Sequence, residues 1–251
     1  MKDIRALAYC NMFAILGAIP ALLEIDEKAK ELVLGKDVSI GFNVKDGPKA
    51  TLFFSGGKAK IKEGLKGAKI CLYFPSCEKF NLMIDGKATP IPTKGFLHLG
   101  FLLKNFMALT DILGEYLRPD KERLKEKEFH KKSTTLMLHV IAGAVCQLGN
   151  NDKISMFSAS NMIDGDVHLS IGDQITVGVR VKDHKLSVIE EIDKPCFSSM
   201  SFVDFETARD LFDGKLNALV AVGLGKVRIS GMISQVDNLN RILDRVAIYL
   251  A

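Results

Sequence analysis

The sequence IGFNVKD at residues 40–46 returns in similar form as VGVRVKD at residues 177–183, and this pair decides how the chain is organised. Two further pairs follow in the same order: MIDGK at 83–87 with LFDGK at 211–215, and GFLHLG at 95–100 with GKVRISG at 225–231. The partners of each pair lie roughly 130 residues apart, which is far longer than the period of a solenoid repeat. The sequence therefore predicts that one domain of about 120 residues occurs twice.

The apolar stretch at residues 6–23 follows Lys2 and Arg5 and has the composition of a secretory signal peptide. Its segment AILGAI at 14–19 has a counterpart, VIAGAV, at 140–145 in the second copy. Because an internal copy cannot be a cleaved leader, we expect a structural helix that opens each domain.

The composition is that of an ordinary globular protein, with 47% hydrophobic and 25% charged residues among 251. A net charge of +4 and the lack of a basic stripe with interleaved aromatic residues argue against a nucleic-acid partner. The five cysteines include no CxxC pair and the histidines are scattered, so we expect no structural zinc. An odd number of cysteines suits a reducing compartment, and we expect a cytoplasmic protein.

The pattern of apolar residues predicts the same elements in each copy. In the first, a helix over 6–34 breaks near Pro20, strands follow at 38–44, 51–54, 58–61 and 69–74, and a hairpin turns at Gly56-Gly57. A short helix begins at Ser76 and ends at Gly86, and its counterpart runs from Asp204 to Gly214. Each copy then has a glycine-bounded strand, at 95–100 and 225–231, and a final amphipathic helix. Clustered strands bracketed by helices predict an α+β fold with a mixed, largely antiparallel sheet.

The expected domains are residues 1–117, a charged linker at 118–132, and a second domain at 133–251. The second copy has about nine residues fewer between its first strand and the Asp-Gly-Lys helix end, and it has no Gly-Gly hairpin. We therefore expect its sheet to be shortened.

These residues and their order resemble the sterol carrier protein 2 family of lipid-binding domains. The resemblance is carried by GFNVKDG at 41–47, the Gly56-Gly57 hairpin, FNLMIDGK at 80–87 and KGFLHLG at 94–100. It covers about residues 35–117, and less completely 172–250. The resemblance implies two domains in which sheet and helices enclose an apolar tunnel. The implied ligand is a fatty acid, an acyl-CoA, a sterol-like molecule or a phospholipid chain, bound without covalent chemistry and without a cofactor.

The residues expected to line the tunnels are apolar, because methionine and phenylalanine adapt to irregular apolar guests. Taken singly, each is also an ordinary core residue, and the set is favoured by the resemblance rather than by its spacing. In the first copy they are Phe74, Phe80, Met83, Ile84, Phe101, Leu102, Phe106, Met107 and Leu109, and in the second Phe212, Met232 and Leu239.

An enzyme is not expected. The sequence has no Gly-x-Ser-x-Gly elbow, no HExxH and no Walker A loop. His98 aligns with Arg228 in the third pair, which excludes a role shared by both copies, and Asp85 and Asp213 precede helix-ending glycines as ordinary turn residues. The principal hypothesis is non-enzymatic carriage of a lipid, with transient contact to a membrane surface; oligomer formation is left open. The alternative is a structural or regulatory module whose tunnels are filled by its own side chains.

Overall fold

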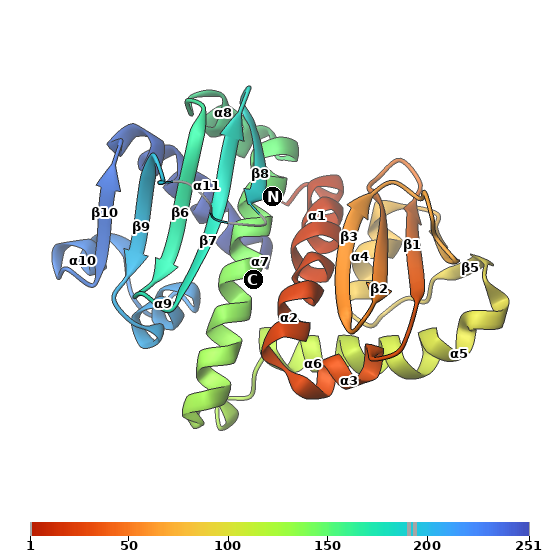
Figure 1. The fold of residues 1–251 in the computed structure, drawn as a ribbon. Helices are drawn as coiled ribbons and strands as arrows, with labels where there is room; N and C mark the ends of the chain where they lie inside the picture. Colours follow the sequence, from red (N-terminus) through yellow and green to blue (C-terminus); the bar gives the residue numbers. More distant parts are fainter. Residues whose placement is uncertain (1, 190–191, 193–194, 251) are drawn as a thin grey trace. The chain divides into compact units, whose positions relative to one another are not determined.

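The computed structural model describes residues 2–189, 192 and 195–250. The chain forms two compact units, Met1–Arg123 and Leu124–Ala251, and each is described by itself (Figure 1). Helix α7 (Lys127–Asn151) begins inside the segment 118–132 that the sequence predicts as a linker. The connection between the units is therefore shorter than expected.

The first unit opens with a helical run of changing pitch. It comprises α1 (Ile4–Cys10), the π-helical turn η1 (Asn11–Ile15), the 3-10 turn η2 (Leu16–Ala18), α2 (Ile19–Ile25) and α3 (Glu27–Val33). Pro20 lies in the first turn of α2, where the missing N–H has no helical acceptor, so the run continues past the predicted break. The chain instead leaves helical geometry at Asp26, which has an extended backbone.

The first sheet has five strands: β1 (Val38–Val44), β2 (Lys49–Ser55), β3 (Lys58–Glu63), β4 (Ile70–Phe74) and β5 (Ile91–Lys94). Their order is β3-β2-β1-β4-β5, with β1 and β4 parallel and the other neighbours antiparallel. Helix α4 (Cys77–Ile84) follows β4. The unit closes with the turn η3 (Phe96–His98), α5 (Leu99–Phe101), the π-helical turn η4 (Leu102–Phe106) and α6 (Met107–Leu117).

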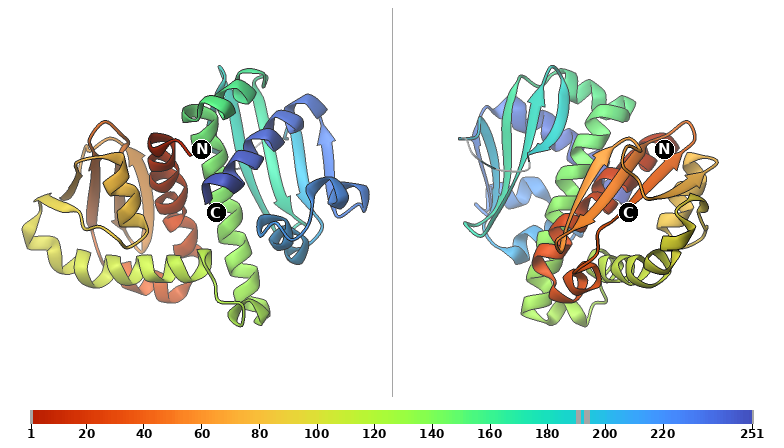
Figure 2. Two further views of the ribbon diagram at one scale, coloured as in Figure 1. Left: turned by 180° about the vertical axis from the view of Figure 1, so that it is seen from behind. Right: turned by 45° about the vertical axis from the view of Figure 1, so that its right-hand side comes forward.

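The second unit repeats this plan. After α7 come α8 (Lys153–Ser160), β6 (Gly165–Ile171), β7 (Ile175–Lys182), β8 (Lys185–Ile189) and β9 (Ser198–Phe202). Then follow α9 (Phe205–Phe212), α10 (Ala218–Gly223), β10 (Val227–Gly231) and α11 (Ile233–Leu250). The sheet order, β10-β9-β6-β7-β8 with β6 and β9 parallel, is that of the first sheet read from the other edge. Helices α7 and α11 lie against one face of this sheet (Figure 2). The predicted α+β class is confirmed.

The first sequence pair joins strands that are not equivalent. The amide of Lys45 donates to the Phe74 carbonyl at 3.0 Å, and the amide of Gly172 donates to the Phe202 carbonyl at 2.8 Å. These matching bonds make β1 equivalent to β6, whereas residues 177–182 belong to β7 and Asp183 to the turn after it. The alignment was wrong by one strand because neighbouring strands share the same alternation.

The second sheet is not shortened, contrary to the expectation. Its β7–β8 hairpin turns at Asp183 and His184, whose φ angles of 50° and 58° are left-handed. Gly56 and Gly57 take the same role in the β2–β3 hairpin, with φ of 59° and 74°. The β7–β8 hairpin could not be recognised by a glycine pair in the sequence, because aspartate and histidine take the turn positions, and both adopt the left-handed conformation more often than most residues.

The second pair is confirmed, since α4 and α9 begin and end in the same way. The side chain of Ser76 accepts from the Lys79 amide at 3.2 Å, and that of Asp204 from the Thr207 amide at 2.7 Å. At the other end Gly86 and Gly214 are left-handed, with φ of 71° and 69°.

One position on these helices also holds a buried polar side chain in both units. Asn81 donates to the Ile4 carbonyl at 3.0 Å, and Arg209 donates to the Ser133 hydroxyl at 2.9 Å. In each unit this side chain ties the helix after the fourth strand to the first helix, although the two residues differ in size and charge.

The third pair is displaced, and its residues 95–100 are not a strand. Gly95 follows β5 with φ of 84°, and its true counterpart is Gly231, which ends β10 with φ of 83°. A Cβ atom on Gly95 would overlap the Lys69 carbonyl, and one on Gly231 would overlap the Phe197 carbonyl. The chain after Gly95 turns into η3, so His98 is not equivalent to Arg228.

An aspartate joins the helices at the closing end of each unit. Asp26 accepts from the Ala29 amide at 2.8 Å and from the Tyr116 hydroxyl at 2.7 Å. Asp152 accepts from the Ser155 amide at 3.1 Å and from the Tyr249 hydroxyl at 2.7 Å. A tyrosine hydroxyl on the last helix of each unit thus holds that helix to the N-terminus of α3 in the first unit and of α8 in the second.

In the second unit Arg245 adds an ion pair to Asp152, with a nitrogen-to-oxygen distance of 3.1 Å. Burial raises the pKa of the Asp152 carboxyl, but hydrogen bonds from Arg245, Tyr249 and Ser155 outweigh it and hold the pKa at about 2. Burial and the bond to Asp26 raise the pKa of the Tyr116 hydroxyl, which therefore remains a donor.

We predict that Gly95→Ala lowers the free energy of unfolding by on the order of 3 kcal/mol, through left-handed strain and the clash with Lys69. Gly100→Ala is the matched control, because Gly100 is helical and a Cβ there meets no atom within 4 Å. It should be neutral or stabilising by about 0.5–1 kcal/mol. Urea denaturation measures both, and equal effects would contradict the left-handed strain and the close approach of the Lys69 carbonyl at Gly95.

We predict that Tyr249→Phe costs about 1.5–3 kcal/mol at pH 7, because a hydrogen bond to a charged carboxylate is lost. The folded pKa of Asp152 lies below its usual value of 3.8, so the stabilisation is complete above pH 4. It is lost as the pH falls toward 2. The difference between wild type and variant should therefore shrink between pH 4 and pH 2 in denaturation curves; a difference that is constant with pH would contradict this role of Asp152.

Candidate functional site

The interior of the first unit contains a cluster of aromatic side chains, which we call the ring cluster. Consecutive rings lie with their centroids 5.1 to 6.5 Å apart, mostly edge to face. Such contacts each contribute about 0.5–1.5 kcal/mol beyond area burial. The ring cluster consists of Phe42, Phe54, Phe74, Phe80, Phe101 and Phe106.

Three structural sources bring these rings together. Alternation along β1, β2 and β4 directs Phe42, Phe54 and Phe74 to the same face of the sheet, and all three are buried. Phe80 comes from α4. Phe101 and Phe106 come from the helical run that closes the unit, and they meet Phe54 at 5.6 and 6.4 Å. This helical run, Phe96–Leu117, which we call the closing run, therefore covers the ring cluster.

The structure brings four of the nine residues predicted for this unit into the ring cluster: Phe74, Phe80, Phe101 and Phe106. Leu102 and Leu109 are buried on the closing run, and Met83 and Ile84 are half-buried near the end of α4. Met107 is about half exposed and does not belong to the interior.

Sequence reasoning missed Phe42 and Phe54, which link the rings of α4 to those of the closing run. The signal was present as alternating apolar residues in the first two strands, but alternation alone does not separate a ligand wall from ordinary core.

In the second unit the predicted residues are divided. Phe212 contacts Phe202 edge to face at 5.5 Å and Leu239 is buried, whereas Met232, just before α11, is 38% exposed. The strand registers and helix caps give the counterparts of three cluster rings, and all three are smaller. In place of Phe42, Phe54 and Phe80 stand Leu169, Val181 and Ala208.

Two helical runs are long and apolar enough to span a membrane by composition: Ile4–Ile25 and Phe96–Leu117. Such runs also occur as core helices of proteins that do not span membranes, so the finding is weak by itself. The two differ in burial: 67% of the first window is buried in the structure but only 22% of the second. The closing run is thus an apolar segment that the fold leaves largely uncovered.

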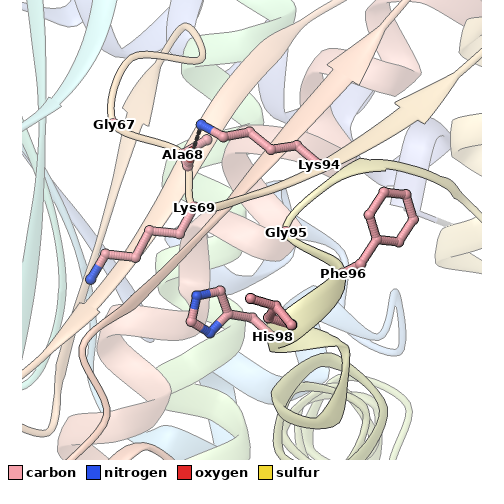
Figure 3. A pocket seen from close by; sticks show the side chains of 8 residues that line it. Gly67, Ala68, Lys69, Lys94, Gly95, Phe96 and His98 are labelled. Carbon is pink, nitrogen blue, oxygen red and sulfur yellow. Dashed lines mark hydrogen bonds between the residues drawn. The ribbon is translucent and has the colours of Figure 1, made fainter.

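An open pocket of about 560 Å³ lies where the chain crosses from β5 into the closing run. It is lined by residues 67–69 and 94–98; Lys69 and His98 lie to one side of Gly95 and Phe96 to the other (Figure 3). The Lys94 ammonium donates to the Ala68 carbonyl at 2.8 Å, and that of Lys69 to the Asp37 carbonyl at 2.9 Å. The pocket therefore combines apolar side chains with two lysines whose ammonium groups are anchored to backbone carbonyls.

The titratable groups offer no further constellation. In the described part of the chain, no three His, Cys, Asp or Glu side chains are grouped so that they could hold a metal ion. Cys71 and Cys77 are free, half-buried thiols.

No protein-family model matches the chain, and no curated protein matches it. Solved structures of similar fold include the sterol carrier protein domain 2 of Helicoverpa armigera, 17% identical over 45% of this chain and 88% of that one, with a TM-score of 0.36. They also include a sterol carrier protein 2, which is 16% identical over 44% of this chain and 92% of that one, with a TM-score of 0.33. A third is the apo form of Sterol Carrier Protein 2 from Yarrowia lipolytica, which is 13% identical over 44% of this chain and 90% of that one, with a TM-score of 0.32. Each of these matches covers less than half of this chain.

We predict that Phe80→Ala lowers the free energy of unfolding by about 3–5 kcal/mol, because the side chain is fully buried between Phe42 and Phe74. Phe53→Ala is the control: Phe53 is half-buried on the opposite face of β2, and its loss should cost only about 1–2 kcal/mol. Equal losses in urea denaturation would contradict the assignment of the ring cluster to the interior.

Proposed function

We propose that the first unit binds a long-chain lipid in its interior and that the chain carries this ligand without chemical change. The ligand is a fatty acid, an acyl-CoA, a sterol-like molecule or a phospholipid chain. The proposal depends on one observation: the ring cluster lies under an apolar closing run that is itself poorly buried.

The free energies are compatible with displacement of rings by a ligand. Burial of each ligand methylene contributes about 0.8 kcal/mol, so about ten methylenes exceed the two or three ring contacts they would replace. After the cost of association, micromolar or tighter binding is expected.

The closing run has the features of a segment that moves. A π-helical turn, η4, interrupts it between α5 and α6, and such turns are frequent at functional sites. The Asn105 side chain donates to the Leu32 carbonyl at 2.7 Å, and Tyr116 is held by Asp26. We propose that the part between Gly95 and Asn105 opens, while the part beyond Asn105 remains in place.

Carriage implies exchange with a bilayer, so a transient contact with a membrane surface belongs to the same proposal. We propose a cytoplasmic site of action, which is supported by five cysteines without a predicted disulfide framework. An enzymatic role has no support in the grouping of polar side chains described above.

We predict that lipid binding changes the fluorescence of a tryptophan placed at Phe101. The chain has no tryptophan, so Phe101→Trp introduces a single reporter beside Phe54. Titration with oleate should shift its emission and saturate in the micromolar range. Phe53→Trp, on the outer face of the same β2 strand, is the matched control and should not respond.

The lining of the proposed ligand site is tested with Met83→Asp. A fluorescent fatty acid measures the affinity of this variant, and a thermal melt checks that it is folded. Affinity should fall by orders of magnitude, because an unpaired carboxylate among apolar groups costs several kcal/mol or has a strongly raised pKa. Unchanged binding in a folded variant would show that Met83 does not line the ligand site. Failure of the wild type to bind any acyl or sterol probe would contradict the proposal and favour a structural module.

A further inference from the structure

The start of the closing run exposes large apolar side chains to solvent. Leu97 is 99% exposed, Leu103 66% and Phe96 64%, and Met107 lies one turn beyond Leu103. We call these four residues the first apolar tip. Single exposed apolar residues are common, but a group of this size on one short segment marks an interaction surface.

The second unit has a group of the same kind at the same place in the fold. Gly231, the counterpart of Gly95, is followed by Met232 and by Ile233, which is 78% exposed. Leu219 on α10 and Leu224 after it are also largely exposed, but they precede β10 and lie at the other end of that strand. We call Met232 and Ile233 the second apolar tip. The two units differ at the ring positions of the interior, yet both keep an exposed apolar tip beside the same left-handed glycine.

The sequence segments that contain the two tips carry basic residues and no acidic ones. Residues 86–110 contain no Asp or Glu, and neither do residues 214–236, although the chain's 30 acidic residues among 251 would place about three in each segment. The first segment carries Lys87, Lys94 and Lys104, and the second carries Lys215, Lys226 and Arg228. Lys69, which also lines the pocket beside the first tip, is balanced by Asp37 at 3.2 Å, and Lys215 is balanced by Asp213 at 2.9 Å.

This combination distinguishes between the partners that an apolar surface can have. The cores of protein–protein interfaces are depleted in lysine. An apolar tip on a segment that has lysines and no carboxylate of its own suits the interface of a bilayer, where leucine and phenylalanine enter the acyl boundary and ammonium groups meet lipid phosphates.

We propose that both apolar tips dock on bilayers that contain anionic phospholipid. The inference rests on the proposed function for its purpose, since the first tip belongs to the run that covers the ring cluster and docking would bring that run to the source of ligand. Its observations are independent of the interior, because they concern exposed side chains only. Two weak sites on one chain raise the overall affinity whenever both engage the same surface.

The test is co-sedimentation of the full chain with vesicles of phosphatidylcholine containing about 30% phosphatidylserine, beside vesicles of phosphatidylcholine alone. The wild type should bind the anionic vesicles more tightly, and the binding should weaken as salt is raised. Leu97→Asp and Ile233→Asp should each weaken it several-fold, and the double variant at least tenfold. Leu34→Asp is the matched control, because Leu34 is a 60% exposed leucine of the first unit outside the tip.

Charge is tested separately with Lys104→Glu, which should weaken binding to anionic vesicles, against Lys28→Glu, an exposed lysine on α3 that should not. No binding of the wild type to anionic vesicles would overturn the inference, and so would a double variant that binds as Leu34→Asp does. A dimer in sedimentation velocity that Leu97→Asp dissociates, without vesicle binding, would identify the tip as a protein interface instead. Fatty-acid titration without vesicles separates the two proposals: retained fatty-acid binding with lost vesicle binding refutes docking alone, and the reverse refutes the interior ligand site alone.

Discussion

One carboxylate in each unit holds two helices in place at once, and the position of the closing run depends on it. Asp26 caps the N-terminus of α3 and Asp152 that of α8, and each accepts a hydrogen bond at 2.7 Å from a tyrosine hydroxyl on the last helix of its unit. A buried carboxylate must have such partners, because an unsatisfied charge in the interior is costly. The bond fixes the far end of the closing run, while its near end turns at a left-handed glycine against the sheet.

The sequence predicted local structure better than equivalence between the copies. The bounds of β1 and both ends of α4 agree with the prediction, since alternation and capping residues act within a few residues of each other. The first sequence pair was misaligned because strands repeat every two residues, so a seven-residue string fits either of two neighbouring strands. The third was misaligned because both strings begin and end with glycine, whereas the structure matches Gly95 with Gly231. The aspartate–tyrosine bonds could not be foreseen, since 90 and 97 residues separate the partners.

For the candidate site, helical stripes revealed Phe80 and Phe106 but strands concealed Phe42 and Phe54. A strand residue that faces a ligand and one that faces the core have the same period. The difference between the two interiors was equally hidden in the sequence. Only the alignment of β1 with β6 shows that Leu169, Val181 and Ala208 stand where the first unit has rings. The two units therefore share exposed apolar side chains beside the same left-handed glycine and differ in the side chains of their interiors.

The central claim is that the interior of this chain binds a lipid, and native mass spectrometry of the intact protein tests it most directly. After incubation with a mixture of oleate, oleoyl-CoA, cholesterol and phosphatidylglycerol, the chain should carry at least one lipid mass per molecule. The bound mass should fall strongly in Met83→Asp and persist in Leu34→Asp. A spectrum that shows only the mass of the bare chain for the folded wild type, with every lipid in excess, would contradict the claim.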